Sequence, residues 1–327
     1  MELIGLYTAV KSRFTKFKAQ GKGLKFGQAF WAVCTKFINQ EDKMDRNELQ
    51  RLERFALEIR LNTVKSLHHL GFGHYGGSLS IVECLSVLYG KVMNIDPKEP
   101  DKKDRDYFIL SKGHAGPGLY SALALKGYFP MDVLMTLNAN GTKLPSHPDR
   151  QLTTGVDMTT GSLGQGISAA CGVAKSFKIS KSDQKVYSIV GDGELNEGQC
   201  WEAFQFAAHN KLDNLFVFLD DNKKQLDGYT KDICDGACYE DKFKAFGFDT
   251  YKVKGNSVEE IYEAIEKASK VSGKPHMIIL DTIKGQGFKY LEEKFDNHHL
   301  RPTPEEVEII AEYIKELENQ LGGVQNA

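Results

Sequence analysis

The segment from Val186 to Gly228 constrains the fold most. The apolar, β-branched run 186–190 is typical of a buried strand, and it breaks at Asp192, which lies between two glycines. Residues at helical spacing follow, and a second apolar run, 215–219, leads into an Asp-Asp-Asn sequence that ends at Asn222. Strands joined in this way run parallel and end at the same edge of a sheet. We therefore expect Asp192 and Asn222 to face one ligand at that edge.

The residue types at this edge favour a metal ion with a diphosphate. Carboxylate and amide oxygens are hard donors that suit Mg²⁺, which usually takes phosphate oxygens as its remaining ligands. The glycines beside Asp192 allow the backbone to approach such a group closely. An aspartate between two glycines is also common in simple turns, so it is the agreement of strand, helix and Asn222 that supports the prediction.

The sequences GDGELNEG and LDNLFVFLDDNKKQLDG resemble the thiamine diphosphate motif of transketolases. The resemblance to the N-terminal, diphosphate-binding half of that family runs from about residue 48 to 300. It implies an α/β thiamine diphosphate-binding fold, with a mainly parallel sheet and helices on both faces. It also implies that the side chains of Asp192 and Asn222 and the backbone carbonyl of Lys224 bind Mg²⁺, and that the Gly193 backbone meets the diphosphate.

Four further motifs, GHYGGS, SKGHA, LPSHP and NHH, each carry a histidine. The resemblance implies that these histidines surround the substrate, and that the second and fourth also contact the cofactor. They are His74, His114, His147 and His298. Taken alone, each is an ordinary turn, helix-start or loop residue. Asn297 replaces a tryptophan of the family, so His299 stays an alternative to His298. The GHYGGS form is one associated with separately encoded N-terminal subunits and related synthases.

The glycine-rich sequence TTGSLGQG resembles the TTGPLGQG turn of the family. The resemblance implies that Gly161, Ser162 and Leu163 contact the cofactor. Serine replaces proline at position 162, and we expect a mild effect because backbone atoms make the contact.

The resemblance further implies a partner chain. In transketolases, the glutamate that activates the aminopyrimidine of the cofactor belongs to a second domain of a neighbouring subunit. We expect a separately encoded C-terminal transketolase subunit to supply this pyrimidine-binding domain in an α2β2 heterotetramer, and we expect this chain to be inactive alone. Glu197 and Glu202 either face the partner in a carboxylate network or are ordinary first-turn acids of a helix.

The implied activity is reversible transfer of a two-carbon ketol unit from a ketose phosphate to an aldose phosphate. Three alternatives stay open. The chain is otherwise an α-type subunit of a 2-oxo acid dehydrogenase, a relative of deoxyxylulose-phosphate synthase, or a non-catalytic module that binds thiamine diphosphate. Which sugars act as donor and acceptor is not visible in the sequence.

Composition narrows the class of partner. Forty-two basic and 44 acidic side chains leave a formal net charge of −2, which does not favour nucleic acid or a membrane surface. The sequence shows no signal peptide and no apolar run long enough to span a membrane, so we expect a cytoplasmic protein. Cys234 and Cys238 form the one closely spaced cysteine pair, and the absence of a nearby histidine argues against zinc.

We expect three regions. Residues 1–44 form a basic and aromatic N-terminal arm, although the same composition is typical of a nucleic-acid, lipid or partner surface. Residues 45–300 form the cofactor-binding domain, which begins with an amphipathic helix that ends at Gly71. Residues 301–327 form a C-terminal helix and a tail that is disordered from Gly322 onward.

Overall fold

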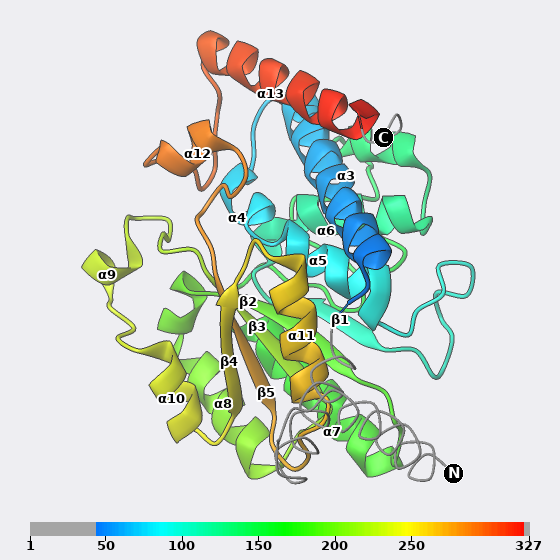
Figure 1. Cartoon of the computed structure of the whole chain (residues 1–327), viewed down its shortest axis with the longest axis vertical. Coiled ribbons are helices and arrows are strands. Elements are labelled where there is room, and N and C mark those ends of the chain that lie inside the picture. Colours follow the sequence, from blue (N-terminus) through cyan, green and yellow to red (C-terminus); the bar gives the residue numbers. More distant parts are fainter. Residues whose placement is uncertain (1–43, 324–327) are drawn as a thin grey trace, which may run out of the picture. The chain divides into compact units, whose positions relative to one another are not determined.

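The computed structural model describes residues 44–323. The predictions for the N-terminal arm before Met44 and for the last four residues lie outside this range. Within it, five parallel strands form one sheet in the order β1-β2-β3-β5-β4 (Figure 1). The strands are β1 (Tyr107–Leu110), β2 (Val186–Gly191), β3 (Leu215–Asp221), β4 (Asp249–Lys254) and β5 (His276–Asp281).

The helices of the described part of the chain alternate with the strands. The α-helices are α3 (Arg46–Leu70), α4 (Tyr75–Leu79), α5 (Val82–Val87), α6 (Gly116–Lys126), α7 (Gln165–Ser180), α8 (Gly198–His209), α9 (Thr230–Ile233), α10 (Tyr239–Ala245), α11 (Val258–Ala268), α12 (Lys289–Glu293) and α13 (Pro304–Gly323). Short π and 3₁₀ turns are η1 (Leu88–Val92), η2 (Gly113–Ala115), η3 (Met131–Thr136) and η4 (Gly193–Asn196).

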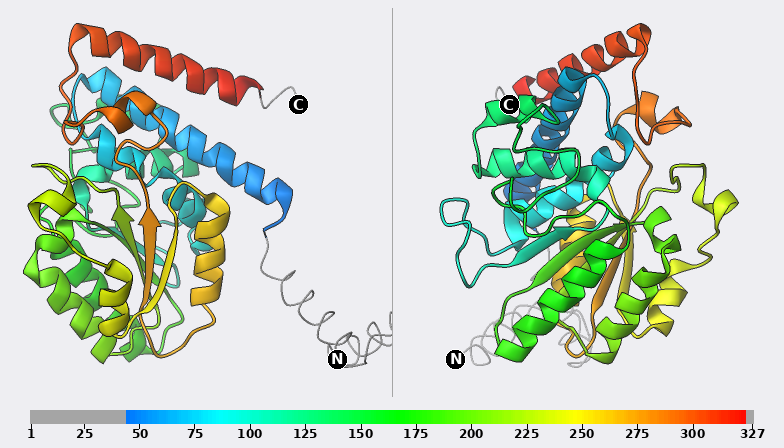
Figure 2. Two further views of the ribbon diagram at one scale, coloured as in Figure 1. Left: turned by 60° about the vertical axis from the view of Figure 1, so that its left-hand side comes forward. Right: turned by 180° about the vertical axis from the view of Figure 1, so that it is seen from behind.

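Helices cover both faces of the sheet (Figure 2). Helices α7, α8 and α10 pack on one face, where Ile167, Phe204 and Phe243 join apolar residues of the strands in one core. Helix α11 lies on the other face and packs against α5 and α3. Burial of both faces explains why the central strands read as continuous apolar runs rather than as alternating ones. The predicted fold class is confirmed.

The amphipathic helix predicted from about residue 45 to Gly71 is present as α3. Strand β4 was not among the predicted strands. Within residues 44–323 it pairs only with β5. It is half-buried and carries charged residues, so its sequence lacks the apolar run that marks the interior strands. Strand β5 ends at Asp281, and Thr282, directly after it, donates to the Asp220 carboxylate.

The C-terminal helix α13 lies along α3 (Figures 1 and 2). The Tyr313 ring stacks on Phe288 with ring centroids 4.0 Å apart, and its hydroxyl donates to the Gly287 carbonyl. The helix continues through Gly323, so it includes the first two residues of the predicted tail. Among the described residues, no helix has the length and apolar character that crossing a membrane requires.

Candidate active site

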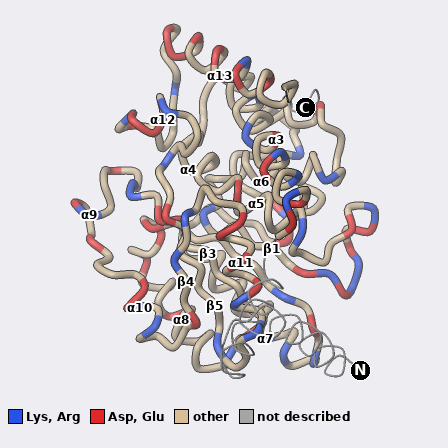
Figure 3. Tube along the Cα trace, viewed as in Figure 1, with Lys and Arg blue, Asp and Glu red and all other residues tan. Residues whose placement is uncertain are grey.

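The carboxyl ends of β1, β2, β3 and β5 meet at one edge of the sheet, as expected for parallel strands. A cavity of about 280 Å³ lies there. Its lining includes seven of the predicted site residues, which are His114, Leu163, Asp192, Gly193, Asn222, Lys224 and His298. Acidic and basic residues are interspersed over the whole described trace (Figure 3). At this edge both signs are buried together, because Lys112 and Lys284 line the same cavity as Asp192.

The first half of the predicted metal site is the buried carboxylate of Asp192. Its Oδ1 accepts a hydrogen bond from the Gly193 backbone at 2.8 Å. Its Oδ2 accepts from the Lys223 backbone at 2.8 Å and from the Thr230 hydroxyl at 3.0 Å. Burial, and after it the charge of Asp220, raises the pKa of Asp192 to about 7. A cation beside this carboxylate would favour its ionised form.

The second half is formed by Asn222 and Lys224. The Asn222 side chain donates from Nδ2 to Asp220, and its Oδ1 accepts from the Lys224 backbone at 3.2 Å. The Lys224 carbonyl accepts from the Lys284 ammonium group at 3.1 Å. No group of three His, Cys, Asp or Glu side chains that could hold a metal occurs within residues 44–323. The candidate donors are thus one carboxylate, one amide and one carbonyl, which leaves positions for phosphate oxygens.

The predicted histidines form one cluster, of which His114 and His298 line the cavity. The His74 ring lies at the centre of the cluster, with centroids 5.6 Å from His114, 5.7 Å from His147 and 5.4 Å from His298. The His114 and His298 rings are 4.8 Å apart. His74 and His147 do not line the cavity itself. The cluster joins segments that follow α3, β1, the η3 region and α12.

Burial lowers the pKa of each of the four histidines in this cluster, which favours the neutral imidazole. Burial is the main reason that the pKa values of His74 and His298 fall to about 3. Burial also places the pKa of His114 well below its usual value, with a further contribution from the charge of Lys112. Neutral imidazoles both donate and accept hydrogen bonds, so the cluster is suited to binding hydroxyl groups and moving protons.

His298 and His299 lie in different positions relative to the cavity. His298 lines the cavity, and its Nδ1 lies 2.8 Å from the Lys284 nitrogen. His299 instead lies between His74 and Phe72, with ring centroids 4.7 and 5.7 Å away. The buried Asn297 side chain donates to two backbone carbonyls, those of Lys284 and Leu291, which fixes this loop against α12. Of these two residues, His298 is therefore the one that lies at the cavity.

The glycine-rich turn lies beside the histidine cluster. A Cβ at Gly161 would be 3.2 Å from the His147 ring, and a Cβ at Gly113 would be 2.7 Å from the Gly161 nitrogen. Gly161 has φ +151°, which side chains rarely adopt. Leu163 lines the cavity, whereas Gly161 and Ser162 do not, and Ser162 is exposed. The turn thus packs backbone against backbone.

Glu194 anchors this turn and was missed in the sequence. Its buried carboxylate accepts from the Ser111 hydroxyl and from the backbone of Gly164 and Gly191, at 2.5, 2.8 and 3.1 Å. It therefore ties the glycine-rich turn to the ends of β1 and β2. The one sequence feature that could have indicated its role is its position directly after the GDG motif. A glutamate at that position is also typical of the exposed first turn of a helix. Glu197 and Glu202, which we did single out, are both exposed.

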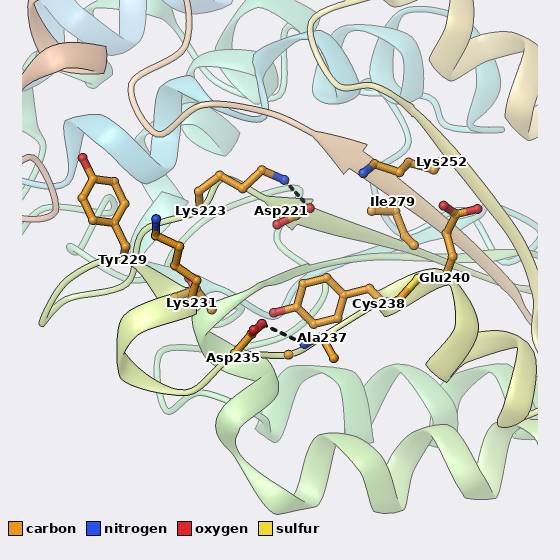
Figure 4. A pocket seen from close by; sticks show the side chains of 13 residues that line it. Asp221, Lys223, Tyr229, Lys231, Asp235, Ala237, Cys238, Glu240, Lys252 and Ile279 are labelled. Carbon is orange, nitrogen blue, oxygen red and sulfur yellow. Dashed lines mark hydrogen bonds and ion pairs between the residues drawn. The ribbon is translucent and has the colours of Figure 1, made fainter.

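A second cavity, of about 480 Å³, is lined by residues of the segment 221–240 together with Lys252 and Ile279 (Figure 4). Its lining includes Lys223 and Thr230, whose backbone and hydroxyl groups hold Asp192. Figure 4 shows the Lys223 ammonium group paired with Asp221 inside it. Cys238 lines this cavity and, like Cys234, is exposed and unpaired. No pattern in the sequence indicates a cavity at this position.

The fold and this edge define an α/β protein with a ligand-sized cavity at the carboxyl edge of its parallel sheet. Residues 52–315 match the family described as transketolase, thiamine diphosphate binding domain. The chain belongs to the transketolase family, and the predicted resemblance is confirmed.

The relatives include proteins of similar length and much longer ones. The 6-deoxy-6-sulfo-D-fructose transketolase subunit SqwG of a Clostridium species is 50% identical over 254 residues, which cover 78% of this chain and 92% of that protein. An apulose-4-phosphate transketolase subunit from Actinobacillus succinogenes is 43% identical over 266 residues, with 81% and 96% covered. Transketolase from Campylobacter jejuni superimposes with a TM-score of 0.76 at 33% identity, with 85% of this chain but only 43% of that chain covered. The chain therefore spans less than half of this transketolase of known structure.

Proposed function

We propose that this chain is the cofactor-binding subunit of a two-chain transketolase that transfers a two-carbon ketol unit between sugars. The observation that carries the proposal is the convergence of Asp192, Asn222 and Lys224 on one cavity beside the histidine cluster, in a chain of this family. In this proposal these three residues hold Mg²⁺, the Gly193 backbone contacts the diphosphate, and residues 161–163 contact the cofactor. The hard oxygen donors and the buried carboxylate of Asp192 support this assignment.

Thiamine diphosphate, when bound, supplies the stabilisation of a carbanion. The chain's own contribution is to hold the cofactor and to manage protons at the substrate. His74, His114, His147 and His298 are the proposed catalytic residues. Their close spacing and the lowering of their pKa values by burial support hydrogen bonds from neutral imidazoles to substrate hydroxyl groups.

For the substrate, we propose a ketose that carries an anionic group at the end remote from its keto group. Two similar subunits are named for 6-deoxy-6-sulfo-D-fructose and for apulose-4-phosphate, one a sulfonate and the other a phosphate. In this proposal the residues that line the cavity of this chain serve the cofactor. The residues that select the anionic group therefore belong to the partner.

The buried thiols of Cys84, Cys171 and Cys200 support the predicted cytoplasmic location.

Exposed apolar side chains flank the mouth of the cavity and support a partner at this site. Leu226, Tyr229, Ile233 and Phe295 are 65, 38, 47 and 60% exposed, and we call them the apolar rim. The Tyr229 and Phe295 rings are 5.6 Å apart, and a Cβ at Gly228 would lie 3.5 Å from Ile233 and 3.8 Å from Phe295. Apolar side chains gathered in this way mark interaction surfaces. Leu226 also lines the cavity, so a chain that closes the site covers the rim.

The rim can be tested by Phe295→Glu. A charge at a desolvated interface position is expected to weaken partner binding by at least about tenfold. Biolayer interferometry between the two purified chains measures the dissociation constant. Ile179→Glu is the matched control, because Ile179 is 71% exposed but lies at the far end of α7, away from the cavity. If Phe295→Glu and Ile179→Glu bound the partner chain with equal affinity, the apolar rim would not be part of the interface.

The activity itself is tested with the assembled complex, Mg²⁺ and thiamine diphosphate. The donors to compare are fructose 6-phosphate, 6-deoxy-6-sulfofructose, apulose 4-phosphate and pyruvate, with an aldose phosphate as acceptor. Transfer of two carbons from at least one ketose, with no decarboxylation of pyruvate, is the expected result. Decarboxylation of pyruvate without transfer would instead favour the 2-oxo acid or deoxyxylulose-phosphate synthase alternatives.

A further inference from the structure

Asp220 is a buried carboxylate at the centre of the sheet's carboxyl edge. It is completely inaccessible to solvent and receives hydrogen bonds from four separate segments. Its Oδ2 accepts from the Ser80 hydroxyl at 2.7 Å, from Lys112, and from Nδ2 of Asn222 at 2.7 Å. Its Oδ1 accepts from the Thr282 hydroxyl at 2.6 Å. Nothing in the proposed function uses this residue directly, because its two oxygens are turned toward these donors.

The contact with Asn222 fixes which way that amide points. A carboxylate accepts hydrogen bonds and cannot donate them, so only the NH₂ end of the Asn222 amide can face Asp220. The carbonyl end, Oδ1, must then face the opposite side, toward the Lys224 backbone nitrogen at 3.2 Å. Both Asn222 and Lys224 line the cavity. An amide without such a partner can present either end.

We propose that Asp220 is a positioning residue that turns the Asn222 amide so that its oxygen, and not its nitrogen, faces the Mg²⁺ ion. The inference rests on the proposed function, because it takes Asn222 as a metal ligand. The same carboxylate joins the ends of β1, β3 and β5 through Lys112, Asn222 and Thr282. The inference adds a second role for Asp220, which is to orient a metal ligand.

An amide side chain at position 220 cannot orient the Asn222 amide in the way that the Asp220 carboxylate does. Three of the four donors meet at the single oxygen Oδ2, whereas an amide there offers either an oxygen with about two acceptor positions or an NH₂ group that cannot accept. Asp220→Asn therefore leaves donors unsatisfied and allows Asn222 to rotate. Partners that orient a metal ligand are typically worth about 10- to 100-fold in metal affinity, and we expect a loss of Mg²⁺ affinity of that size.

Isothermal titration calorimetry of the full chain, with Mg²⁺ titrated at a fixed concentration of thiamine diphosphate, measures this affinity independently of turnover. The set consists of the unmodified chain, Asp220→Asn, Asn222→Ala and the double variant. If Asp220 acts through Asn222, the double variant binds Mg²⁺ as weakly as Asn222→Ala alone and no weaker. If the loss of Mg²⁺ affinity in the double variant equals the product of the losses in the two single variants, the inference is wrong.

Thr282→Val is the matched control, because it removes a hydrogen bond to the same carboxylate without touching Asn222. It should lower the melting temperature but change the Mg²⁺ dissociation constant less than about threefold, since the contact that orients Asn222 is kept. A loss equal to that of Asp220→Asn would make the role of Asp220 merely structural. An Asn222→Ala variant that binds Mg²⁺ normally would contradict the proposed metal site itself, so the two failures are distinguishable.

Asp220→Asn leaves the buried ammonium group of Lys112 without its counterion, which can prevent folding. In that case the comparison is made in a Lys112→Gln/Asp220→Asn background, with and without Asn222→Ala. Because Asn222 is no longer oriented there, its replacement by alanine should change the Mg²⁺ affinity less than about threefold, against the larger loss that it causes in the unmodified chain. An equal loss in both backgrounds would refute the positioning role.

Discussion

Asp192→Ala is expected to abolish Mg²⁺-dependent binding of thiamine diphosphate. Asp192 is the only carboxylate among the proposed metal donors, and its oxygens also organise the loop through Lys223 and Thr230. Removing a direct ligand should exceed the loss from an orienting partner, so we expect more than about a 100-fold increase in the dissociation constant of the Mg²⁺–cofactor complex. Turnover by the assembled enzyme should fall below detection.

Calorimetry measures the binding, and circular dichroism verifies that the variant is folded. Asp232→Ala is the matched control, because Asp232 is an exposed acid on the neighbouring helix α9 and has no place in the proposed site. The control should bind the cofactor normally. If Asp192→Ala bound Mg²⁺ and thiamine diphosphate as tightly as the unmodified chain, the metal assignment would be wrong.

His114→Ala is expected to reduce kcat by about 10²- to 10⁴-fold, the usual contribution of a positioned proton-transfer group. His114 lies in the cavity with its ring close to both His74 and His298. A Cβ at Gly77 would be 2.9 Å from its Nε2, so the backbone holds the ring closely in place. Steady-state kinetics of the assembled complex with a ketose donor provides the measurement.

His69→Ala serves as the control for this prediction, because His69 is an exposed histidine in the last turn of α3. It should leave kcat unchanged. Calorimetry with thiamine diphosphate separates a loss of cofactor binding from a loss of chemistry in His114→Ala. A kcat within about twofold of the unmodified enzyme would remove His114 from the proton-transfer groups.

The meeting of Asp192 and Asn222 could be predicted because it depends on two robust rules. Apolar runs of strand length identify buried parallel strands, and parallel strands joined by a helix end at the same edge. The structure places both residues there. The histidine cluster could be predicted only through the family resemblance, since its members come from segments that periodicity does not bring together.

The buried charged residues could not be predicted from local pattern. Lys112, Glu194, Asp220 and Lys284 are all buried, although charged residues are usually exposed. Each is stabilised by partners far away in the sequence, as Asp220 is by Ser80 and Thr282. The fold must be known before such a partner can be assigned. Strand β4 was missed for a related reason, because its position at the edge of the sheet requires no apolar run.

The predictions about boundaries and assembly remain predictions. They comprise the arm at 1–44, the domain end at residue 300, the α2β2 heterotetramer and the role of Glu197 and Glu202. The relatives named as transketolase subunits are covered over 92 and 96% of their lengths, which supports a two-chain enzyme. The proposed function depends on this assembly more than on any single residue.

Native mass spectrometry of the protein purified from its own host, with Mg²⁺ and thiamine diphosphate present throughout, decides whether a second chain completes the enzyme. We predict a complex that contains two copies of this chain, two copies of a second chain and two cofactors. Sequencing the second chain would then identify the subunit that supplies the pyrimidine-binding domain. A homo-oligomer of this chain that carries the cofactor and transfers ketol units without a second chain would contradict the proposed two-chain enzyme.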